Sequence, residues 1–525
     1  MKGRNVPAVL LVFLAASAIT SNAQSRQLRQ TSYLKASNTE AGDRFGSGGA
    51  LEGHAVAISG DGNTIAVGAP VESSNAKGIN GNQNDNSLYR SGAVYIFTRS
   101  GNGFAQQAYL KASNPGQSDM FGYFVGLSAD GNTMAVSAPF ESSGAKGING
   151  NQDDNSVPQA GAVYIFTRSG TTWSQQAYVK ASNTGEAPVG DQLDVDGDQF
   201  GFSISLSDDG NTLAAGAIAE DSAAKEINGN QNDNSAASAG AVYVFARSGN
   251  AWSQQAYVKS SNIGAGDIFG HSVSLSADGN TLAVGASEED GATKEINGPP
   301  DDRLNGPGAV YVFTRAGGSW SQQAYVKASN TELMDSFGTN VALSDDGNTL
   351  ASSSLDEDCL LTGVNPPGCD KDGPERVSSG MAFVFVRNGT TWTQQAVFKA
   401  SNSGKFDWFG ARLALSGDGN IFAVGAQIED SAAQGINGRQ DDDSGPEAGV
   451  VYFFTRTGAT WSQQAYVKGS NTEAFDEFGS SLSLSRDGRT MVVGAQYEDG
   501  AAKGVNGNQA GNSALDSGAV YVFAY

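Results

Sequence analysis

The sequence predicts an all-β fold, a seven-bladed β-propeller of four-stranded antiparallel blades. Three observations predict it: a unit that recurs seven times, two short turns within each unit, and a first strand that matches the one missing from the last unit. Recurrence at this length is typical of propellers, whose blades bury their faces against one another. No long segment has the 3.6-residue periodicity of an amphipathic helix. We therefore expect almost no helix.

The recurring unit is centred on a Phe-Gly pair, and successive pairs lie 68 to 79 residues apart. The pairs are Phe45-Gly46, Phe121-Gly122, Phe200-Gly201, Phe269-Gly270, Phe337-Gly338, Phe409-Gly410 and Phe478-Gly479. In the fourth unit, strands are expected at residues 271–276, 281–286, 309–315 and 320–327. The Asp278-Gly279-Asn280 turn joins the first two strands, because Asp-Gly favours the positive φ angles of a tight hairpin. Residues 316–319 join the last two.

The two ends of the chain predict how the ring closes. The last unit stops at Phe523, Ala524 and Tyr525, so it lacks a fourth strand. Residues 28–38, LRQTSYLKASN, match the fourth-strand segment WSQQAYVKASN of other units. The N-terminal strand is therefore expected to complete blade seven, which leaves no unfinished blade edge.

These units resemble the FG-GAP repeat of the integrin α-subunit propeller. In six of the seven units a Gly-Ala-Pro-like triplet follows the Phe-Gly pair by 16 residues, as at Ser137-Ala138-Pro139 and Gly285-Ala286-Ser287. The resemblance implies the propeller fold and, at the level of the family, adhesion. The Asp-rich calcium loop of integrins is replaced here by a bare Asp-Gly turn, so that site is not carried over. The chain also lacks an integrin's stalk, membrane span and tail.

The start of the chain and its charge indicate an exported, acidic protein. Lys2 and Arg4, an apolar run at residues 8–19 and the small residues before Ala23 are typical of a signal peptide, so we expect residues 1–23 to be removed and residues 24–525 to form a single propeller domain. No later run is long enough to span a membrane. The net charge of −23 disfavours nucleic acid. We expect a secreted, extracellular protein; the sequence does not indicate an oligomeric state.

Only two cysteines are present, Cys359 and Cys369, ten residues apart in one loop. In an exported protein a local disulfide is the natural interpretation. A metal pair is the alternative, but it would need further cysteine or histidine ligands nearby.

All the long loops are expected on one face of the disk, which we call the top face. It receives the loops that join strand two to strand three and the links from strand four to the next blade. Loops held by a rigid scaffold commonly carry binding residues. Two carboxylates recur there in each unit, an Asp two residues before the pivot Phe and a Glu after strand two.

Oxygen ligands so concentrated make calcium a candidate cofactor. The candidate ligands are Asp119 with Glu141, Asn80, Asn82 and Asn84 in the first long loop, and Asp194, Asp196 and Asp198 with Glu220 in the third unit. The alternative interpretation is that Asp and Asn side chains bond their own backbone and only stabilise turns.

Specific binding is expected where the sevenfold symmetry is broken. It is broken by insertions at residues 47–53 and 187–195 and by the cysteine loop. The candidate ligand-binding residues are His54, which follows the first insertion, and Trp408, at a position that is otherwise Arg, Met, Gln, Ile, Ser or Glu.

The hypothesis is a secreted recognition or adhesion module for an extracellular protein or glycan. The alternative is a carbohydrate-active enzyme, a polysaccharide lyase or glycoside hydrolase, because paired carboxylates can cleave glycosides; no catalytic residue can be named, and no nucleophile elbow or phosphate loop is present.

Overall fold

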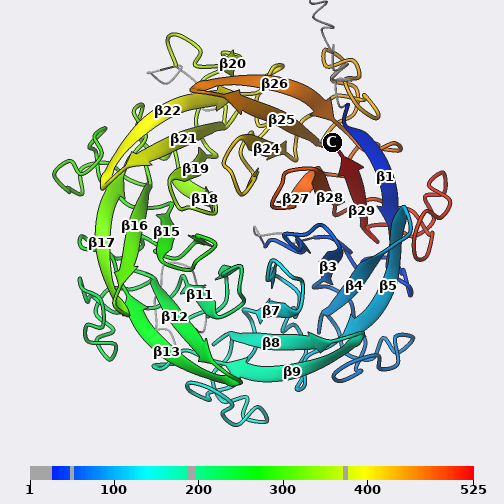
Figure 1. Cartoon of the computed structure of the whole chain (residues 1–525), viewed down its shortest axis with the longest axis horizontal. Helices are drawn as coiled ribbons and strands as arrows, with labels where there is room; N and C mark the ends of the chain where they lie inside the picture. The colour runs from blue at the N-terminus through cyan, green and yellow to red at the C-terminus, as the bar shows by residue number, and fades with distance from the viewer. Residues whose placement is uncertain (1–26, 48–52, 186–196, 370–376) are drawn as a thin grey trace, which may run out of the picture.

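Seven antiparallel sheets surround a central axis in the computed structural model, which describes residues 27–47, 53–185, 197–369 and 377–525 (Figure 1). Within these residues the secondary structure consists of strands and turns, and no helix is long and apolar enough to cross a membrane. The predicted all-β, seven-bladed propeller is confirmed.

Each blade runs from an inner first strand to an outer fourth strand. Blade one contains β2 (Val56–Ile58), β3 (Thr64–Ala69), β4 (Ala93–Ser100) and β5 (Gly103–Leu110); blade two contains β6 (Val125–Leu127), β7 (Thr133–Ala138), β8 (Ala162–Ser169) and β9 (Thr172–Val179). Blade three contains β10 (Ile204–Leu206), β11 (Thr212–Ala217), β12 (Ala241–Ser248) and β13 (Ala251–Val258); blade four contains β14 (Ser272–Leu275), β15 (Thr281–Ala286), β16 (Ala309–Ala316) and β17 (Ser319–Val326).

Blade five has an additional two-residue strand, β20, beside its outer strand. It contains β18 (Phe337–Leu343), β19 (Thr349–Ser354), β20 (Gly363–Val364), β21 (Met381–Asn388) and β22 (Thr391–Lys399). Blade six contains β23 (Arg412–Leu415), β24 (Ile421–Ala426), β25 (Val450–Thr457) and β26 (Thr460–Val467); blade seven contains β27 (Phe478–Leu484), β28 (Thr490–Ala495), β29 (Ala519–Ala524) and β1 (Arg29–Leu34).

The ring closes as the two chain ends predict. The first strand, β1, pairs antiparallel with the last, β29, with Tyr33 opposite Tyr521 (Figure 1, blue beside red). Blade seven is therefore built from both ends of the chain, and β1 supplies the fourth strand that pairs with the third, as in the other blades.

The Phe-Gly pair recurs because it packs each blade against its neighbour. Phe269 is fully buried, and its ring meets Tyr311 and Phe313 edge-on with centroids 5.5 and 6.0 Å away. Gly270 has a φ of +97°, and a Cβ there would lie 2.7 Å from the carbonyl oxygen of Ala241 in the preceding blade. Only glycine allows this close approach.

Side-chain hydrogen bonds join the blades at the face opposite the top face. The Arg315 guanidinium donates to Asn280 in the turn of its own blade (2.9 Å) and to Gln255 of blade three (2.9 Å). The Trp320 indole donates to the same Gln255 oxygen at 3.0 Å. The short turns therefore take part in contacts between neighbouring blades. The long loops lie on the opposite, top face.

Candidate functional site

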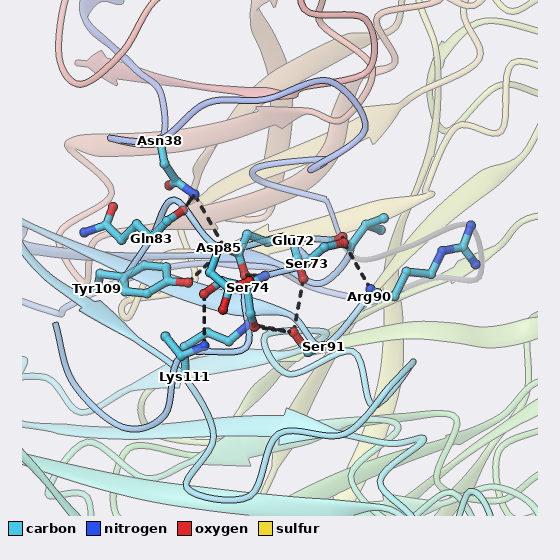
Figure 2. Close-up of polar contacts among 12 residues, drawn as sticks. Asn38, Glu72, Ser73, Ser74, Gln83, Asp85, Arg90, Ser91, Tyr109 and Lys111 are labelled. Atoms are coloured by element: carbon cyan, nitrogen blue, oxygen red, sulfur yellow. Dashed lines mark hydrogen bonds and ion pairs between the residues drawn. The ribbon is translucent and has the colours of Figure 1, made fainter. Parts of the chain in front are cut away.

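A buried ion pair lies beneath the top face of each blade. In blade one, Lys111 Nζ lies 2.8 Å from Glu72 Oε2, and both side chains are almost fully buried (Figure 2). The Tyr109 hydroxyl donates to Glu72 Oε1 at 2.9 Å, and Asn38 Nδ2 donates to the same oxygen at 3.4 Å. The backbone N–H of Ser74 donates to Glu72 Oε2. Lys111 therefore neutralises the buried carboxylate, and three hydrogen-bond donors satisfy its oxygens.

The ion pair of this network repeats in all seven blades, with Lys–Glu distances of 2.8 to 3.1 Å. The pairs are Glu72–Lys111, Glu141–Lys180, Glu220–Lys259, Glu289–Lys327, Glu357–Lys399, Glu429–Lys468 and Glu498–Lys35. The recurring Glu is therefore a scaffold residue that anchors the start of each long loop.

Two of the candidate calcium ligands, Glu141 and Glu220, belong to this network. Glu141 accepts from Lys180 Nζ (2.9 Å), the Tyr178 hydroxyl (2.9 Å) and Asn114 Nδ2 (2.9 Å). A cation would have to displace these donors. In the described part of the chain, no group of three or more Asp, Glu, His or Cys residues is arranged to hold a metal.

The remaining candidate ligands are dispersed. Asn82 Oδ1 accepts the N–H of Asn84 (3.1 Å), which is the turn chemistry that Asn residues commonly provide. Asn80 Oδ1 instead accepts the backbone N–H of Tyr109 (3.0 Å) and so joins the long loop to β5. Asp194 and Asp196 lie outside the described residues. Calcium binding therefore stays a prediction.

The Asp that precedes each pivot Phe is buried close to the Glu of the network. Burial, reinforced by the charge of Glu141, raises the pKa of Asp119 to about 7. Burial raises the pKa of Asp198 as well, with the charge of Glu220 as the next cause. Asp119 accepts the backbone N–H of Gly116 at 2.6 Å, so its local role is to close the link between blades.

A cavity of about 270 Å³ lies on the central axis, and His54 and His271 line it. The His54 ring stacks on Phe124 with centroids 5.3 Å apart. Burial and the nearby charge of Arg412 lower the pKa of His54 to about 4, so His54 is neutral at physiological pH. The Arg412 guanidinium donates to the carbonyl oxygens of Ser480 (2.9 Å) and Gly53 (3.0 Å), which ties blades six, seven and one together across the axis.

Of the two ligand-binding candidates, His54 lines the axial cavity and Trp408 does not. Trp408 lies on the link between β22 and β23 of the top face, and it is half-buried with a φ of +56°. Its neighbour Phe406 is the exposed ring of that turn, with 53% of its surface accessible. The same position in the next link is Phe475, at 56%. Sequence reasoning missed both, although each replaces a residue that is Gly or Ser in four of the other links.

The predicted disulfide joins Cys359 and Cys369, whose Cα atoms are 5.5 Å apart. The bond joins two points of the loop between β19 and β21, and within this loop β20 pairs with β22 of blade five.

Comparison with known proteins identifies the repeat. The FG-GAP repeat family model matches residues 104–166, 252–313 and 461–523. No curated protein matches the chain.

Among solved structures, the chain is similar to the periplasmic gluconolactonase PpgL of Pseudomonas aeruginosa, with 14% identity, a TM-score of 0.44, and coverage of 85% of this chain and 97% of that one. It is also similar to the β-propeller domain of Cps50 (Swd1) from Myceliophteria thermophila, with 9% identity, a TM-score of 0.47, and coverage of 95% and 100%. Similarity at this level carries no argument about activity.

Proposed function

We propose that this chain, an FG-GAP repeat protein with a seven-bladed propeller, is a secreted recognition or adhesion module that binds an extracellular protein or glycan through its top face. The buried Glu–Lys network supports this proposal, because it holds the bases of the long loops rigid. The exported location rests on the signal-peptide pattern of residues 1–23, which lie outside the described structure.

Exposed apolar side chains in a strained backbone conformation carry the proposal. Met334, Phe406 and Phe475 occupy one equivalent position in three successive links, with φ angles of 61°, 65° and 68°. The first and fourth units have Gly42 and Gly266 there, at 82° and 86°. A left-handed conformation costs a residue other than glycine about 1–2 kcal/mol, and an exposed ring buries little surface in return. Folding alone favours glycine at all of these positions, so the bulky side chains point to contact with a partner.

The charge of the surroundings limits the partner. Glu473 is exposed two residues before Phe475 and Lys405 is exposed beside Phe406, whereas the chain as a whole carries a net charge of −23. Such a surface repels polyanions, so the proposal favours neutral or cationic partners.

The test is a glycan and protein array probed with the mature chain and with a Phe406→Gly/Phe475→Gly variant. We expect binding to weaken by about tenfold or more, as hot-spot truncations do, with no loss of thermal stability because glycine relieves the strain. Ser118→Gly is the matched control, since Ser118 occupies the same position with a φ of 64° but presents no large apolar group. Trp408→Ala in the same assay tests whether the adjacent half-buried ring takes part.

Equal binding by the double variant and the wild type would contradict the proposed face. The same preparations, incubated with a polysaccharide panel, separate recognition from turnover. Saturable binding without product supports the module, whereas product formation that is lost on carboxylate substitution would replace it with an enzyme.

A further inference from the structure

Blade five lacks the two phenol groups that complete the buried network in the other six blades. There, one Tyr from the third strand and one from the fourth pack together with ring centroids 5.2 to 5.6 Å apart. The pairs are Tyr95/Tyr109, Tyr164/Tyr178, Tyr243/Tyr257, Tyr311/Tyr325, Tyr452/Tyr466 and Tyr521/Tyr33. Blade five has Phe383 and Val397 at these positions.

The missing hydroxyls leave an acceptor unpaired. In the other blades the third-strand Tyr donates to an Asn on the link, as Tyr95 does to Asn38 Oδ1 at 2.6 Å. The equivalent oxygen in blade five, Asn330 Oδ1, is buried and has no hydrogen-bond partner, and the Asn330 side chain as a whole is 6% exposed. Glu357 Oε1, which the fourth-strand Tyr would serve, keeps the Asn330 Nδ2 donor at 3.3 Å.

A pocket lies beside Val397, which stands where the other blades have a Tyr. It has a volume of about 230 Å³, and Asn330, Met381 and Val397 line it, with Asn365, Pro366 and Cys369 of the disulfide loop on the opposite wall. Val397 is half-buried, whereas the Tyr residues at its position are almost fully buried. The pocket therefore combines the apolar groups of Met381, Val397 and Pro366 with the polar groups of Ser329, Asn330 and Asn365. One of these polar groups, Asn330 Oδ1, is a buried acceptor that lacks a donor.

We infer that this pocket binds a phenol group, a hydroxylated aromatic ring that takes the space beside Val397 and supplies the donor that Asn330 Oδ1 lacks. The ring would pack beside Val397 and the Met381 thioether, both of which line the pocket, since sulfur–aromatic contacts are favourable. The hydroxyl would donate to Asn330 Oδ1, which pairs an acceptor that is costly to leave buried and unpaired. Water alone would supply the donor but would leave the apolar walls hydrated.

The phenol can come from a free small molecule or from a Tyr side chain of a partner protein. Neither source involves Phe406 or Phe475, so this site stands or falls independently of the proposed recognition face.

The test is calorimetric titration of the full mature chain with p-cresol and with toluene, which has the same shape without the hydroxyl. We expect one saturable p-cresol site, with toluene weaker by about tenfold or more because it leaves Asn330 Oδ1 unpaired. Val397→Tyr should abolish the site by filling it. Tyr95→Phe with Tyr109→Val, the matched control, should create a second site in blade one, because it removes the Tyr95 donor of Asn38 Oδ1 together with the fourth-strand ring.

N-acetyl-tyrosine amide then distinguishes the sources. Competition with p-cresol shows that the opening admits an amino-acid residue and supports a protein partner; binding of p-cresol without such competition supports a small phenolic molecule. The inference is overturned if the wild type binds no p-cresol, if toluene binds equally well, or if binding persists in Val397→Tyr. Should that variant not fold, Val397→Phe fills the same volume and serves the same purpose.

Discussion

Blades one and five use the same buried ion pair in different surroundings. In blade one, Glu72 is held by Lys111, Asn38 and the Tyr109 hydroxyl. In blade five, Glu357 keeps Lys399 at 3.1 Å but has no Tyr hydroxyl donor. Burial raises the pKa of Glu357, and the charge of Lys399 offsets this only in part. The ion pair is thus common to every blade, whereas the Tyr hydroxyls are present in six blades and absent from blade five.

Blade five also carries three buried hydroxyls without hydrogen-bond partners on a single strand. Its second strand, β19, has Ser352, Ser353 and Ser354 where blade one has Val67, Gly68 and Ala69, and each serine Oγ is buried without a hydrogen-bond partner. These groups lower stability, since an unpaired buried hydroxyl costs about 1–3 kcal/mol. Blade five thus differs from the other six blades in a way that lowers the stability of the fold. Such a difference indicates selection for a property other than folding.

The largest effect is expected from opening the ring. Deletion of residues 27–35 removes β1 together with Tyr33 and Lys35, which leaves Glu498 buried without its counter-ion and β29 without a partner strand. We expect a protein that aggregates or melts far below the mature chain, as measured by calorimetry and size-exclusion chromatography. Identical melting temperatures would contradict the closure seen here.

The ion pairs should differ in how much each blade depends on them. Lys111→Met leaves Glu72 charged in a buried site, so a loss of about 3–5 kcal/mol in the free energy of unfolding is expected. Lys399→Met should cost less, because Glu357 already has a raised pKa and takes up a proton more readily. Urea unfolding at pH 7 measures both. The double variant Glu72→Gln/Lys111→Met is the control and should recover part of the loss; equal losses in the two blades would show that their surroundings do not matter.

The pH dependence compares the same two blades. Burial and the charge of Glu72 raise the pKa of Asp43 to about 7, above its ordinary value of 3.8. The folded state therefore binds the proton more tightly, and the stability this confers is complete below about pH 4 and lost as the pH rises through 7. Relative to the wild type, Asp43→Asn should gain stability between pH 4.5 and 7.5, by about 1.4 kcal/mol for each unit of raised pKa.

Glu357→Gln should show the same sign in blade five, because the pKa of Glu357 is raised too. Denaturant unfolding at the two pH values gives both differences. Curves that stay parallel to the wild type would mean that these carboxyl groups titrate normally.

The sequence was sufficient for the fold because its signals are local and repeated. The Phe269-Gly270 pair, the Asp278-Gly279 turn and the strand borrowed from residues 28–38 each have a direct physical meaning, and all three are confirmed. The buried network was only half-recognised: Glu141 recurs visibly, but its partner Lys180 lies 39 residues away in sequence and meets it only after the blade has formed.

The link conformation and the pocket could not be predicted, for a related reason. The exposure of Phe406 depends on a left-handed turn that no sequence motif specifies, and Gly and Ser at the equivalent positions give the only signal. The blade-five pocket depends on two absences, a hydroxyl at Phe383 and a ring at Val397. These become meaningful only when Asn330 is found beside them with an unpaired oxygen.

The smallest effect, and the only gain, is expected from making blade five resemble blade one. Phe383→Tyr supplies a hydroxyl for Asn330 Oδ1, and Val397→Tyr supplies the ring and a donor for Glu357 Oε1. A hydrogen bond to an otherwise unpaired buried group contributes about 1 kcal/mol, and the added ring buries apolar surface that Val397 leaves half-exposed. The disulfide loop forms the opposite wall, so the new ring must fit against Pro366 and Cys369, and part of the gain is offset by crowding. We therefore expect the double variant to raise the free energy of unfolding by about 1–2 kcal/mol in urea titrations. The reverse change in blade one, Tyr95→Phe with Tyr109→Val, should lower it by more, because that blade has no loop disulfide to support a partly empty site. The blade-five variant could instead be destabilised while the blade-one variant behaves as expected. The walls of the pocket then no longer accommodate the Tyr side chains of the other blades, which supports binding of a ring from outside the chain.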